Sequence, residues 1–322
     1  MARIAVIGAG IAGLACARAL TDAGHTLIVF EKSRGLGGRM STRRTAHGTF
    51  DHGAQYFTAR DPLFQRVVQS WVAGGIAAPY AGRIVRIGTG EPQPLSRDEP
   101  RYVATPAMNS ACRALSAGVS VELECQVTAV TPGENGWRLS WSEGGESGFD
   151  AVVLAVPAIQ AAPLCTAVPA LAGEVSAASY APCWVVLARY ATPLPVNFDA
   201  AFVTDAVLGW VMRDASRPGR APGERWVLQA NAQWSGRHLE DAASAVVPSM
   251  VAAFHAAMGV TTAPEEALGH RWRYALSPGL HVDCLWDERQ RIGACGDWCA
   301  DGRIEGAYLS GTRLAAQVLR TL

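Results

Sequence analysis

The fold is decided by residues 4–20, which read IAVIGAGIAGLACARAL. The four apolar residues at the start predict a short buried strand, and the run after Gly13 predicts a helix. Gly8 permits the tight turn between them, Gly10 lets the backbone approach a diphosphate, and Gly13 lets the helix pack closely on the strand. The helix N-terminus then offers free N–H groups and a partial positive charge to phosphates. This pattern predicts a dinucleotide-binding turn.

A second predicted strand, residues 26–30, ends at an acidic residue. Glu31 follows this strand directly and lies eighteen residues after Gly13. A carboxylate at that distance can accept hydrogen bonds from a ribose and would repel a 2′-phosphate. A lone glycine motif is weak in a chain with 33 glycines, but the strand, helix and acid around this one make it specific.

A second glycine cluster indicates which dinucleotide is bound. Residues 32–42 read KSRGLGGRMST, so a Gly-Gly-Arg turn follows Glu31 within eight residues. This turn resembles the flavoprotein family that includes amine oxidases, phytoene desaturases and renalases. In that family the Gly-Gly backbone lies against the FAD diphosphate and the arginine, here Arg39, helps to neutralise it. The alternative is a flexible surface loop with an incidental arginine; the spacing favours FAD. We expect the flavin to be bound without a covalent link, although the eight cysteines leave covalent attachment open.

The same resemblance implies further contacts with FAD. The segment 48–57 passes the flavin with small residues, Val127 contacts adenine, and the strand at 292–297 ends in a Gly-Asp turn near the ribityl chain or diphosphate. The helix that follows points its N-terminus at the flavin pyrimidine, where it can stabilise negative charge. The predicted FAD-binding residues are Gly8, Gly10, Ile11, Ala12, Gly13, Glu31, Lys32, Gly37, Gly38, Arg39, Met40, Gly53, Ala54, Gln55, Tyr56, Val127, Gly296, Asp297, Gly306 and Ala307.

Composition limits the class of protein. The 322 residues are 49% hydrophobic and 17% charged, and the 28 basic and 28 acidic residues cancel, so a large core is expected and a nucleic-acid surface is not. No apolar run reaches a membrane span, and the glycines argue against a secretory leader at residues 4–20. The eight cysteines include no Cys-x-x-Cys pair, which predicts no metal and a cytoplasmic protein with reduced thiols.

The order of patterns predicts an α/β fold with two interleaved domains. The apolar run at 150–157 predicts a strand buried in a parallel sheet, and the apolar spacing over about 239–258 predicts a long helix. We expect a Rossmann-like FAD-binding domain from residues 1–60, 103–160 and 285–322. We expect a substrate domain, an antiparallel sheet with helices, from residues 61–102 and 161–284, so that the architecture is that of an amine oxidase-like two-domain flavoprotein.

The substrate domain shows no evident acid–base apparatus. His52, His270 and His281 are isolated, and an isolated histidine is more often structural than catalytic, so no catalytic residue is predicted apart from the flavin. Residues 269–275, GHRWRYA, are dense in side chains that bind ligands. Stacking aromatic rings and arginines that grip phosphate would suit a flat dinucleotide; the alternative is an aromatic core with solvated arginines. The predicted substrate-binding residues are Trp184, Trp210, His270, Arg271, Arg273 and Tyr274.

Three segments together resemble the bacterial renalases within that flavoprotein family. They are DHGAQYF at 51–57, PCW at 182–184 and HRWRYA at 270–275. The resemblance implies oxidation of 2- and 6-dihydroNAD(P), with hydride transfer to flavin N5 and reoxidation by O2 to give NAD(P)+ and H2O2. A dihydropyridine expels hydride with its own ring-nitrogen lone pair, so position and stacking would suffice without a general base.

Two other functions stay open. An amine oxidase or a desaturase of an apolar ring resembles the chain too, although such amine oxidases typically place a lysine near flavin N5. The single lysine here, Lys32, is expected beside the FAD ribose, which argues against that class without excluding it. A flavin-binding protein without turnover is the third possibility. The sequence leaves open the preferred isomer, the NAD or NADP form and the oligomeric state.

Overall fold

The apolar residues after Ala2 form the central strand of a parallel sheet. β1 (Arg3–Ile7) pairs in parallel with β13 (Ala151–Leu154) on one side and with β2 (Thr26–Phe30) on the other. All four residues of β13 are fully buried, which confirms the strand predicted there. The six strands run in the order β19-β20-β13-β1-β2-β9, and only β19 is antiparallel to its neighbour. The remaining strands are β9 (Ser120–Glu122), β19 (Leu285–Asp287) and β20 (Ile292–Ala294).

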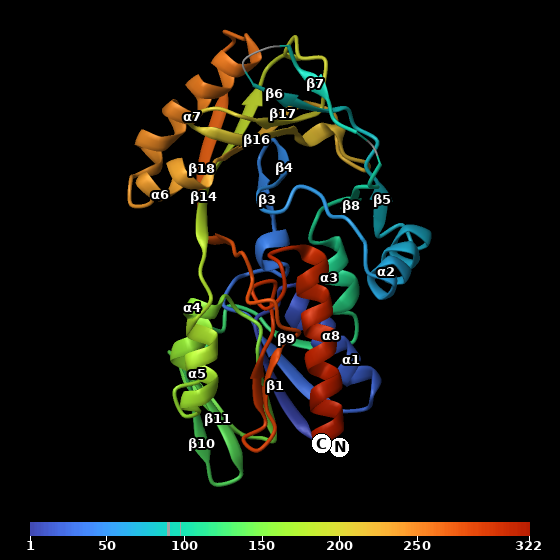
Figure 1. Cartoon of the computed structure of the whole chain (residues 1–322), viewed down its shortest axis with the longest axis vertical. Helices are drawn as coiled ribbons and strands as arrows, with labels where there is room; N and C mark the ends of the chain where they lie inside the picture. Colours follow the sequence, from blue (N-terminus) through green and yellow to red (C-terminus); the bar gives the residue numbers. More distant parts are fainter. Residues whose placement is uncertain (89–90, 97) are drawn as a thin grey trace.

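This sheet is the centre of the lower of two lobes in Figure 1, where both chain termini also lie. The computed structural model describes residues 1–88, 91–96 and 98–322. One face of the sheet packs on α1 (Ile11–Asp22), α3 (Ser110–Leu115) and α8 (Ile304–Thr321). The other face packs on α4 (Ala158–Ala161), α5 (Pro169–Ser176) and the three-stranded sheet of β10 (Ala129–Gly133), β11 (Gly136–Trp141) and β12 (Gly144–Phe149).

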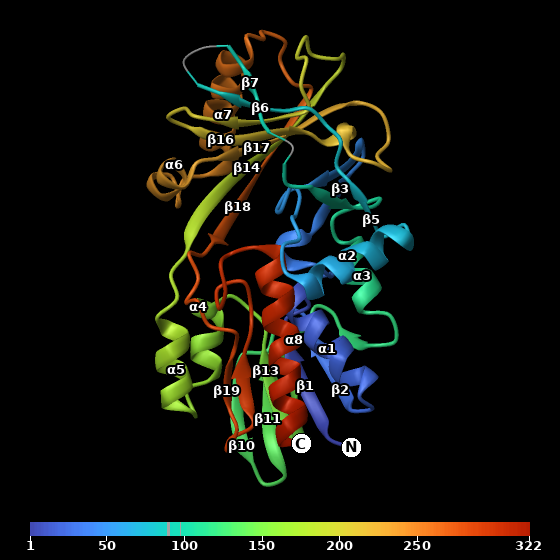
Figure 2. The ribbon, with the colours of Figure 1, turned by 45° about the vertical axis from the view of Figure 1, so that its right-hand side comes forward.

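The upper lobe is built on a seven-stranded sheet with helices on its outer face (Figures 1 and 2). Its strand order is β18-β14-β17-β16-β15-β6-β7, and every neighbouring pair is antiparallel except β15 with β6. Its elements are β6 (Ile84–Ile87), β7 (Gln93–Pro94), β14 (Ala181–Tyr190), β15 (Ala200–Val203), β16 (Leu208–Arg213), β17 (Glu224–Ala230), β18 (Glu266–Leu276), α6 (Ala232–Arg237) and α7 (Ala243–Met258). The helix predicted at 239–258 therefore starts four residues later than expected.

Five further elements lie between the lobes or beside them. The hairpin of β3 (Thr42–Thr45) and β4 (Gly48–Asp51) rises from the lower lobe to the underside of the upper sheet (Figure 1). Phe50 of this hairpin packs against Val185, Leu187 and Val227 of the upper sheet. At the other edge, α2 (Pro62–Ala73) lies beside the short pair of β5 (Ala77–Pro79) and β8 (Tyr102–Ala104). The hairpin thus ties the two lobes together.

Two predicted domain boundaries differ from the lobes. Residues 62–73 were expected in the substrate domain, but the apolar face of α2 packs on the lower lobe, where Phe64 lies 5.2 Å from the ring centroid of Tyr308. The segment after 160 was expected there as well, but α5 buries Leu171 and Val175 in the core of the lower lobe. Of the predicted segment 61–102, residues 89, 90 and 97 lie outside the described residues.

No helix in the described part of the chain is both long enough and apolar enough to cross a membrane.

Candidate active site

A cavity of about 1690 Å³ lies between the two lobes. Its lower wall is the turn between β1 and α1 together with the loops after β2 and β20, and its upper wall is the underside of the seven-stranded sheet. All of the predicted FAD-binding residues line this cavity except Gly13 and Gly306. The structure therefore brings together segments from the start, middle and end of the chain.

The first glycine turn has the shape that a diphosphate requires. Gly8 has φ +108° and a Cβ there would lie 2.6 Å from the carbonyl oxygen of Ala155, so only glycine fits. A Cβ at Gly13 would collide with the carbonyl oxygen of Gly8. Gly10, by contrast, has no atom within 4 Å of its missing Cβ, and α1 begins there without a side-chain cap. The first N–H groups of α1 are thus left for an anion in the cavity.

The second glycine cluster packs directly on the first. The N–H of Gly37 donates to the carbonyl oxygen of Ala9 at 2.9 Å. Gly37 and Gly38 both have positive φ, at +117° and +51°, and a Cβ on Gly38 would lie 3.6 Å from the Cα of Gly10. The two turns consequently form one continuous backbone cradle.

Glu31 supports this cradle from behind. Its Oε2 accepts from the N–H of Ala9 at 2.9 Å and its Oε1 from the N–H of Ser33 at 2.8 Å. The carboxylate is buried but borders the cavity, so each oxygen keeps a lone pair for a ribose hydroxyl. Lys32, the next residue, also lines the cavity and donates to Oε1 of Gln160 at 3.2 Å.

Arg39 and Asp297 join the second glycine cluster to the C-terminal motif. The guanidinium donates to both carboxylate oxygens, with Nη1 2.7 Å from Oδ2, and Nη1 also donates to the carbonyl oxygen of Ala275. Beside this pair, the N–H of Gly296 donates to Oγ of Ser310 in α8. The N-terminal turn of α8 borders the same region through Ile304 and Ala307.

The loop after β4 closes the cavity on its hairpin side. A Cβ at Gly53 would collide with the carbonyl oxygen of Arg39, so glycine is required there. Gln55 donates from Nε2 to the carbonyl oxygens of Asp51 and Gly53, and Gln229 of β17 donates to the Gly53 carbonyl at 2.7 Å. The side chain of Gln55 is therefore held within the loop's own hydrogen bonds.

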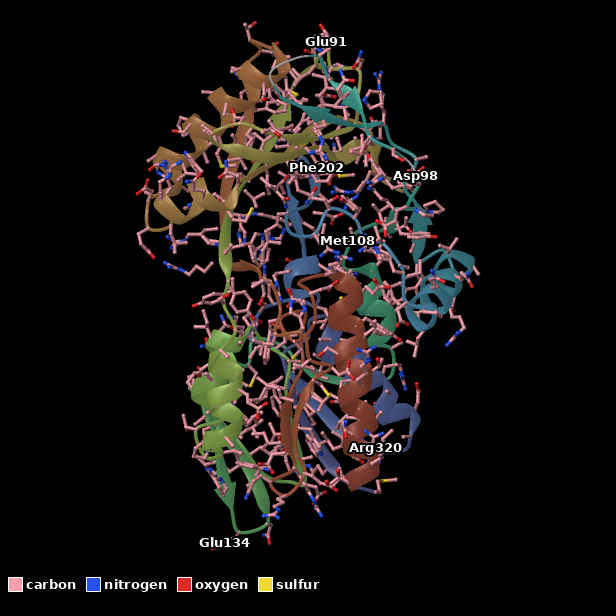
Figure 3. The ribbon with its side chains drawn as sticks, in the orientation of Figure 1. Glu91, Asp98, Met108, Glu134, Phe202 and Arg320 are labelled. Atoms are coloured by element: carbon pink, nitrogen blue, oxygen red, sulfur yellow. The ribbon has the colours of Figure 1, made fainter. Side chains whose placement is uncertain are left out.

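The upper part of the cavity is an aromatic chamber under the seven-stranded sheet. Trp210 lies 4.6 Å from Phe202 in an edge-to-face arrangement and 5.5 Å from Tyr56 between ring centroids. Phe202 is labelled in Figure 3 on the side of the upper sheet that faces the lower lobe. We use the name aromatic chamber for this part of the cavity, which is lined by His52, Tyr56, Cys183, Phe202, Trp210, Gln229, His270 and Trp272.

Two histidines of the aromatic chamber are held neutral. Their rings lie 4.6 Å apart, and Trp272 lies within 5.2 Å of both. Burial lowers the pKa of His52 to about 4, with smaller contributions from His270 and the charge of Arg43. Burial and then Arg43 lower the pKa of His270 to about 4. Nδ1 of His52 and Nε2 of His270 are buried without a hydrogen-bond partner, so both rings are uncharged polar surfaces.

Strand alternation divides the predicted cluster at 270–274 between two faces of β18. His270 and Trp272 face the aromatic chamber. Arg271 and Arg273, at the positions between them, both form ion pairs with the exposed carboxylate of Glu240, and Arg273 Nη2 lies 2.8 Å from Oε2. These arginines line the cavity, but each is already ion-paired with Glu240. From the sequence they were expected to be free to bind phosphate.

Tyr274 borders the cavity and lies 5.7 Å from the ring of Tyr180. Trp184 does not border it. Its neighbour Val185 points toward the hairpin, so Trp184 faces the other way, into the core beneath the helices, where its Nε1 donates to the carbonyl oxygen of His238. His281 also lies outside the cavity lining. We therefore do not retain Trp184 in the proposed site.

Sequence reasoning missed several residues of the cavity lining. Phe202 and Gln229 come from β15 and β17, and Arg43 comes from the hairpin. Arg43 and Arg44 follow Arg39 of the Gly-Gly-Arg turn by four and five residues, and this short spacing was the available signal. No cluster of three or more His, Cys, Asp or Glu side chains suited to a metal occurs within residues 1–88, 91–96 and 98–322.

The profile described as "Flavin containing amine oxidoreductase" matches residues 89–319, and that described as "NAD(P)-binding Rossmann-like domain" matches residues 6–71. The fold and the site thus define a class: the chain belongs to the flavin-containing amine oxidoreductase family. It is an FAD-dependent oxidoreductase.

Among individual proteins, the chain is similar to renalase from Mus musculus. The identity is 30% over 171 residues, which cover 50% of this chain and 48% of renalase. It is also 43% identical to 15-cis-phytoene desaturase from Synechococcus elongatus over 61 residues, which cover 19% of this chain and 13% of the desaturase. The chain thus spans about half the length of the first relative and far less of the second.

Solved structures share the whole fold at low identity. Cyclohexylamine oxidase from Brevibacterium oxydans IH-35A superimposes with a TM-score of 0.76 at 15% identity, over 99% of both chains. A triple mutant of putrescine oxidase gives 0.75 at 15% identity, also over 99% of both chains. These likenesses confirm the two-domain flavoprotein architecture.

The residues present fit FAD. The open backbone at Gly10, the uncapped start of α1 and the cradle formed with Gly37 and Gly38 suit its diphosphate, and Glu31 stands where a ribose would follow. The family match gives FAD as the cofactor.

Proposed function

We propose that this enzyme oxidises isomeric dihydronicotinamide dinucleotides, the 2- and 6-dihydro forms of NAD(P), with O2 as the electron acceptor. FAD, when bound, supplies the hydride acceptor and the reaction with O2. The balance is dihydroNAD(P) + H+ + O2 → NAD(P)+ + H2O2. The similarity to renalase supports this reaction, and the free cysteines suit an enzyme of the reducing cytoplasm.

The charge of the cavity is the observation that carries the proposal. The chain as a whole has no net charge, but nine basic and only two acidic side chains line the cavity. Both acids are engaged, Glu31 by backbone N–H groups and Asp297 by Arg39. Four of the nine bases, Arg39, Arg271, Arg273 and Arg303, have carboxylate partners, so five are left without an ion pair among the described residues. Such a lining attracts an anionic dinucleotide and offers no free carboxylate, among the described residues, to a protonated amine.

The aromatic chamber suits a nicotinamide ring. Tyr56, Phe202 and Trp210 present flat apolar surfaces that can stack on a planar ring or exclude water from it. His52 and His270 are neutral near pH 7, so neither adds a charge beside the ring. Because a dihydropyridine needs no general base to release hydride, these residues need only bind and orient the substrate.

The alternative of an amine oxidase is less well supported. The single lysine, Lys32, follows Glu31 and donates a hydrogen bond to Gln160, and it is not among the residues of the aromatic chamber. An oxidase or desaturase of an uncharged ring stays compatible with the aromatic lining. A flavin-binding protein without turnover would have the same cradle.

An anaerobic stopped-flow titration with 2-, 4- and 6-dihydroNAD separates these functions. We expect fast bleaching of the flavin absorbance by the 2- or 6-isomer and little by the 4-isomer. Bleaching by amines or apolar ring donors alone would replace the proposal with the second function, and a flavin that no donor reduces would favour the third.

A pair of variants tests the chamber. Trp210→Leu removes stacking surface and should raise the substrate concentration needed for half-maximal bleaching. Trp286→Leu, in β19 of the lower lobe, is the matched control and should bleach like the wild type. Equal behaviour of both variants would remove Trp210 from the site.

A further inference from the structure

Arg43 stands out among the basic residues of the cavity. Two of the other arginines that line the cavity, Arg271 and Arg273, are already paired with Glu240. In the described part of the chain, the guanidinium of Arg43 has no ion pair, hydrogen bond or aromatic partner, although it lines the cavity and is half-buried. A half-buried guanidinium without a counter-ion is a ready partner for an anion.

The register of the hairpin places Arg43 on the chamber side. Arg43 lies opposite Phe50 in the pairing of β3 with β4, and cross-strand partners in an antiparallel pair project to the same face. Phe50 packs on the underside of the upper sheet. The charge of Arg43 accordingly acts on both His52 and His270, which places it close to the neutral histidine pair.

This position is separate from the cradle for the FAD diphosphate. The cradle lies in the lower lobe at Gly10 and Gly38, whereas the hairpin that carries Arg43 reaches the underside of the upper lobe (Figure 1), where Phe50 packs on β14 and β17. The cavity therefore has two places for an anion, one formed by backbone N–H groups and one by a guanidinium.

We propose that Arg43 binds the diphosphate of the dinucleotide substrate. This inference rests on the proposed function, because it assumes that a nicotinamide dinucleotide enters the chamber. A planar guanidinium can donate two parallel hydrogen bonds to phosphate oxygens, which would fix the substrate while its ring lies among Tyr56, Phe202 and Trp210.

The hairpin is rigid enough to present such a group. Thr42 donates to Asp51 across the pair, and Arg220 holds the same carboxylate by an ion pair, in surroundings where Asp51 is fully buried. The backbone at Arg43 is therefore already ordered, and little backbone entropy would be lost when the side chain binds an anion.

The test is equilibrium binding of NAD+ to the FAD-loaded protein by isothermal titration calorimetry. Arg43→Gln should weaken binding about ten- to hundredfold, the loss expected for charge-assisted hydrogen bonds. It should also flatten the salt dependence of the dissociation constant, while Arg43→Lys, which keeps the charge, should fall between. Arg66→Gln, on the exposed face of α2, is the matched control and should bind NAD+ like the wild type.

Reduction kinetics give a second readout. The same 2- or 6-dihydro isomer is supplied as the dinucleotide and as the nicotinamide riboside, which has no phosphate. Arg43→Gln should need more of the dinucleotide for half-maximal bleaching, with an unchanged rate at saturation, and should be unaffected with the riboside.

The outcomes separate the two claims. If the wild type is bleached by the dinucleotide and Arg43→Gln binds NAD+ equally well, this inference is wrong and the proposed function stands. If Arg43→Gln loses FAD, Arg43 belongs to the cofactor site and the inference is also wrong. If the wild type neither binds NAD+ nor reacts with any isomer, both claims are wrong.

Discussion

Arg217 donates a hydrogen bond from Nη2 to Oε1 of Gln55 at 2.6 Å, and both side chains are buried. The same guanidinium forms an ion pair with Asp214, and Asp51 and Arg220 complete a cluster of two acids and two bases with almost no exposed surface. Because Gln55 belongs to the loop that borders the cavity, this buried cluster holds the side chain of Gln55 in place beside the candidate active site.

Arg217→Met should destabilise the protein strongly. The variant leaves the carboxylates of Asp51 and Asp214 with one counter-charge, that of Arg220, in a site without water access. Breaking a buried ion pair in this way costs about 3–5 kcal/mol of unfolding free energy. Urea unfolding of the FAD-free and FAD-loaded protein measures it. Arg66→Met, on the exposed face of α2, should change the free energy by less than about 0.5 kcal/mol; equal stability of the two variants would contradict the role of the cluster.

Gly13→Ala should abolish FAD binding. The added Cβ would collide with the carbonyl oxygen of Gly8 and lie 2.9 Å from Cβ of Ala155, so the turn must open and its N–H groups must move. Gly173→Ala, in α5, is the matched control, because nothing lies within 4 Å of its Cβ position and alanine favours a helix by about 1 kcal/mol. Flavin content after purification measures the effect. A yellow, FAD-saturated Gly13→Ala protein would show that the close packing is dispensable.

Glu31→Gln should weaken FAD binding without changing the fold. Both carboxylate oxygens accept hydrogen bonds from backbone N–H groups, those of Ala9 and Ser33. In glutamine one of these oxygens becomes an NH2 donor, which would face a backbone N–H donor. The mismatch costs about 1–3 kcal/mol. Fluorescence titration of the FAD-free protein with FAD gives the dissociation constant. The exposed Glu122→Gln should bind FAD as the wild type does, and an unchanged constant for Glu31→Gln would remove this carboxylate from the cradle.

The cofactor half of the site was predictable because its signal is local. The glycines at 8, 10 and 13 encode a strand, a turn and a helix start within one short stretch, and the structure forms them there. The continuous apolar run at 150–157 likewise predicts a strand that is buried on both faces of a parallel sheet, and residues 151–154 form it. Such features depend on neighbours in the sequence and not on how distant strands align.

The substrate half depends on register and on which face of the sheet meets the other lobe. Arg271 and Arg273 were expected to bind substrate together with His270, but the pairing of β18 with β14 places them on the opposite face of the strand. Trp184 was misplaced for the same reason. The place of Phe202 beside Trp210 follows from the pairing of β15 with β16, which the sequence did not predict.

The neutral histidine pair predicts a pH-dependent stability. The folded-state pKa values of His52 and His270 are about 4, against about 6.5 in an unfolded chain. Between these values the unfolded chain binds more protons, so stability is complete above pH 6.5 and is lost as the pH falls toward 4. We expect a loss of about 1–2 kcal/mol per histidine between pH 7.5 and 5. Urea unfolding across this range measures the loss of unfolding free energy.

The double variant His52→Gln, His270→Gln should flatten the dependence of this free energy on pH, and His47→Gln, at an exposed position, should not. A double variant that keeps the wild-type slope would show that other groups cause the acid sensitivity.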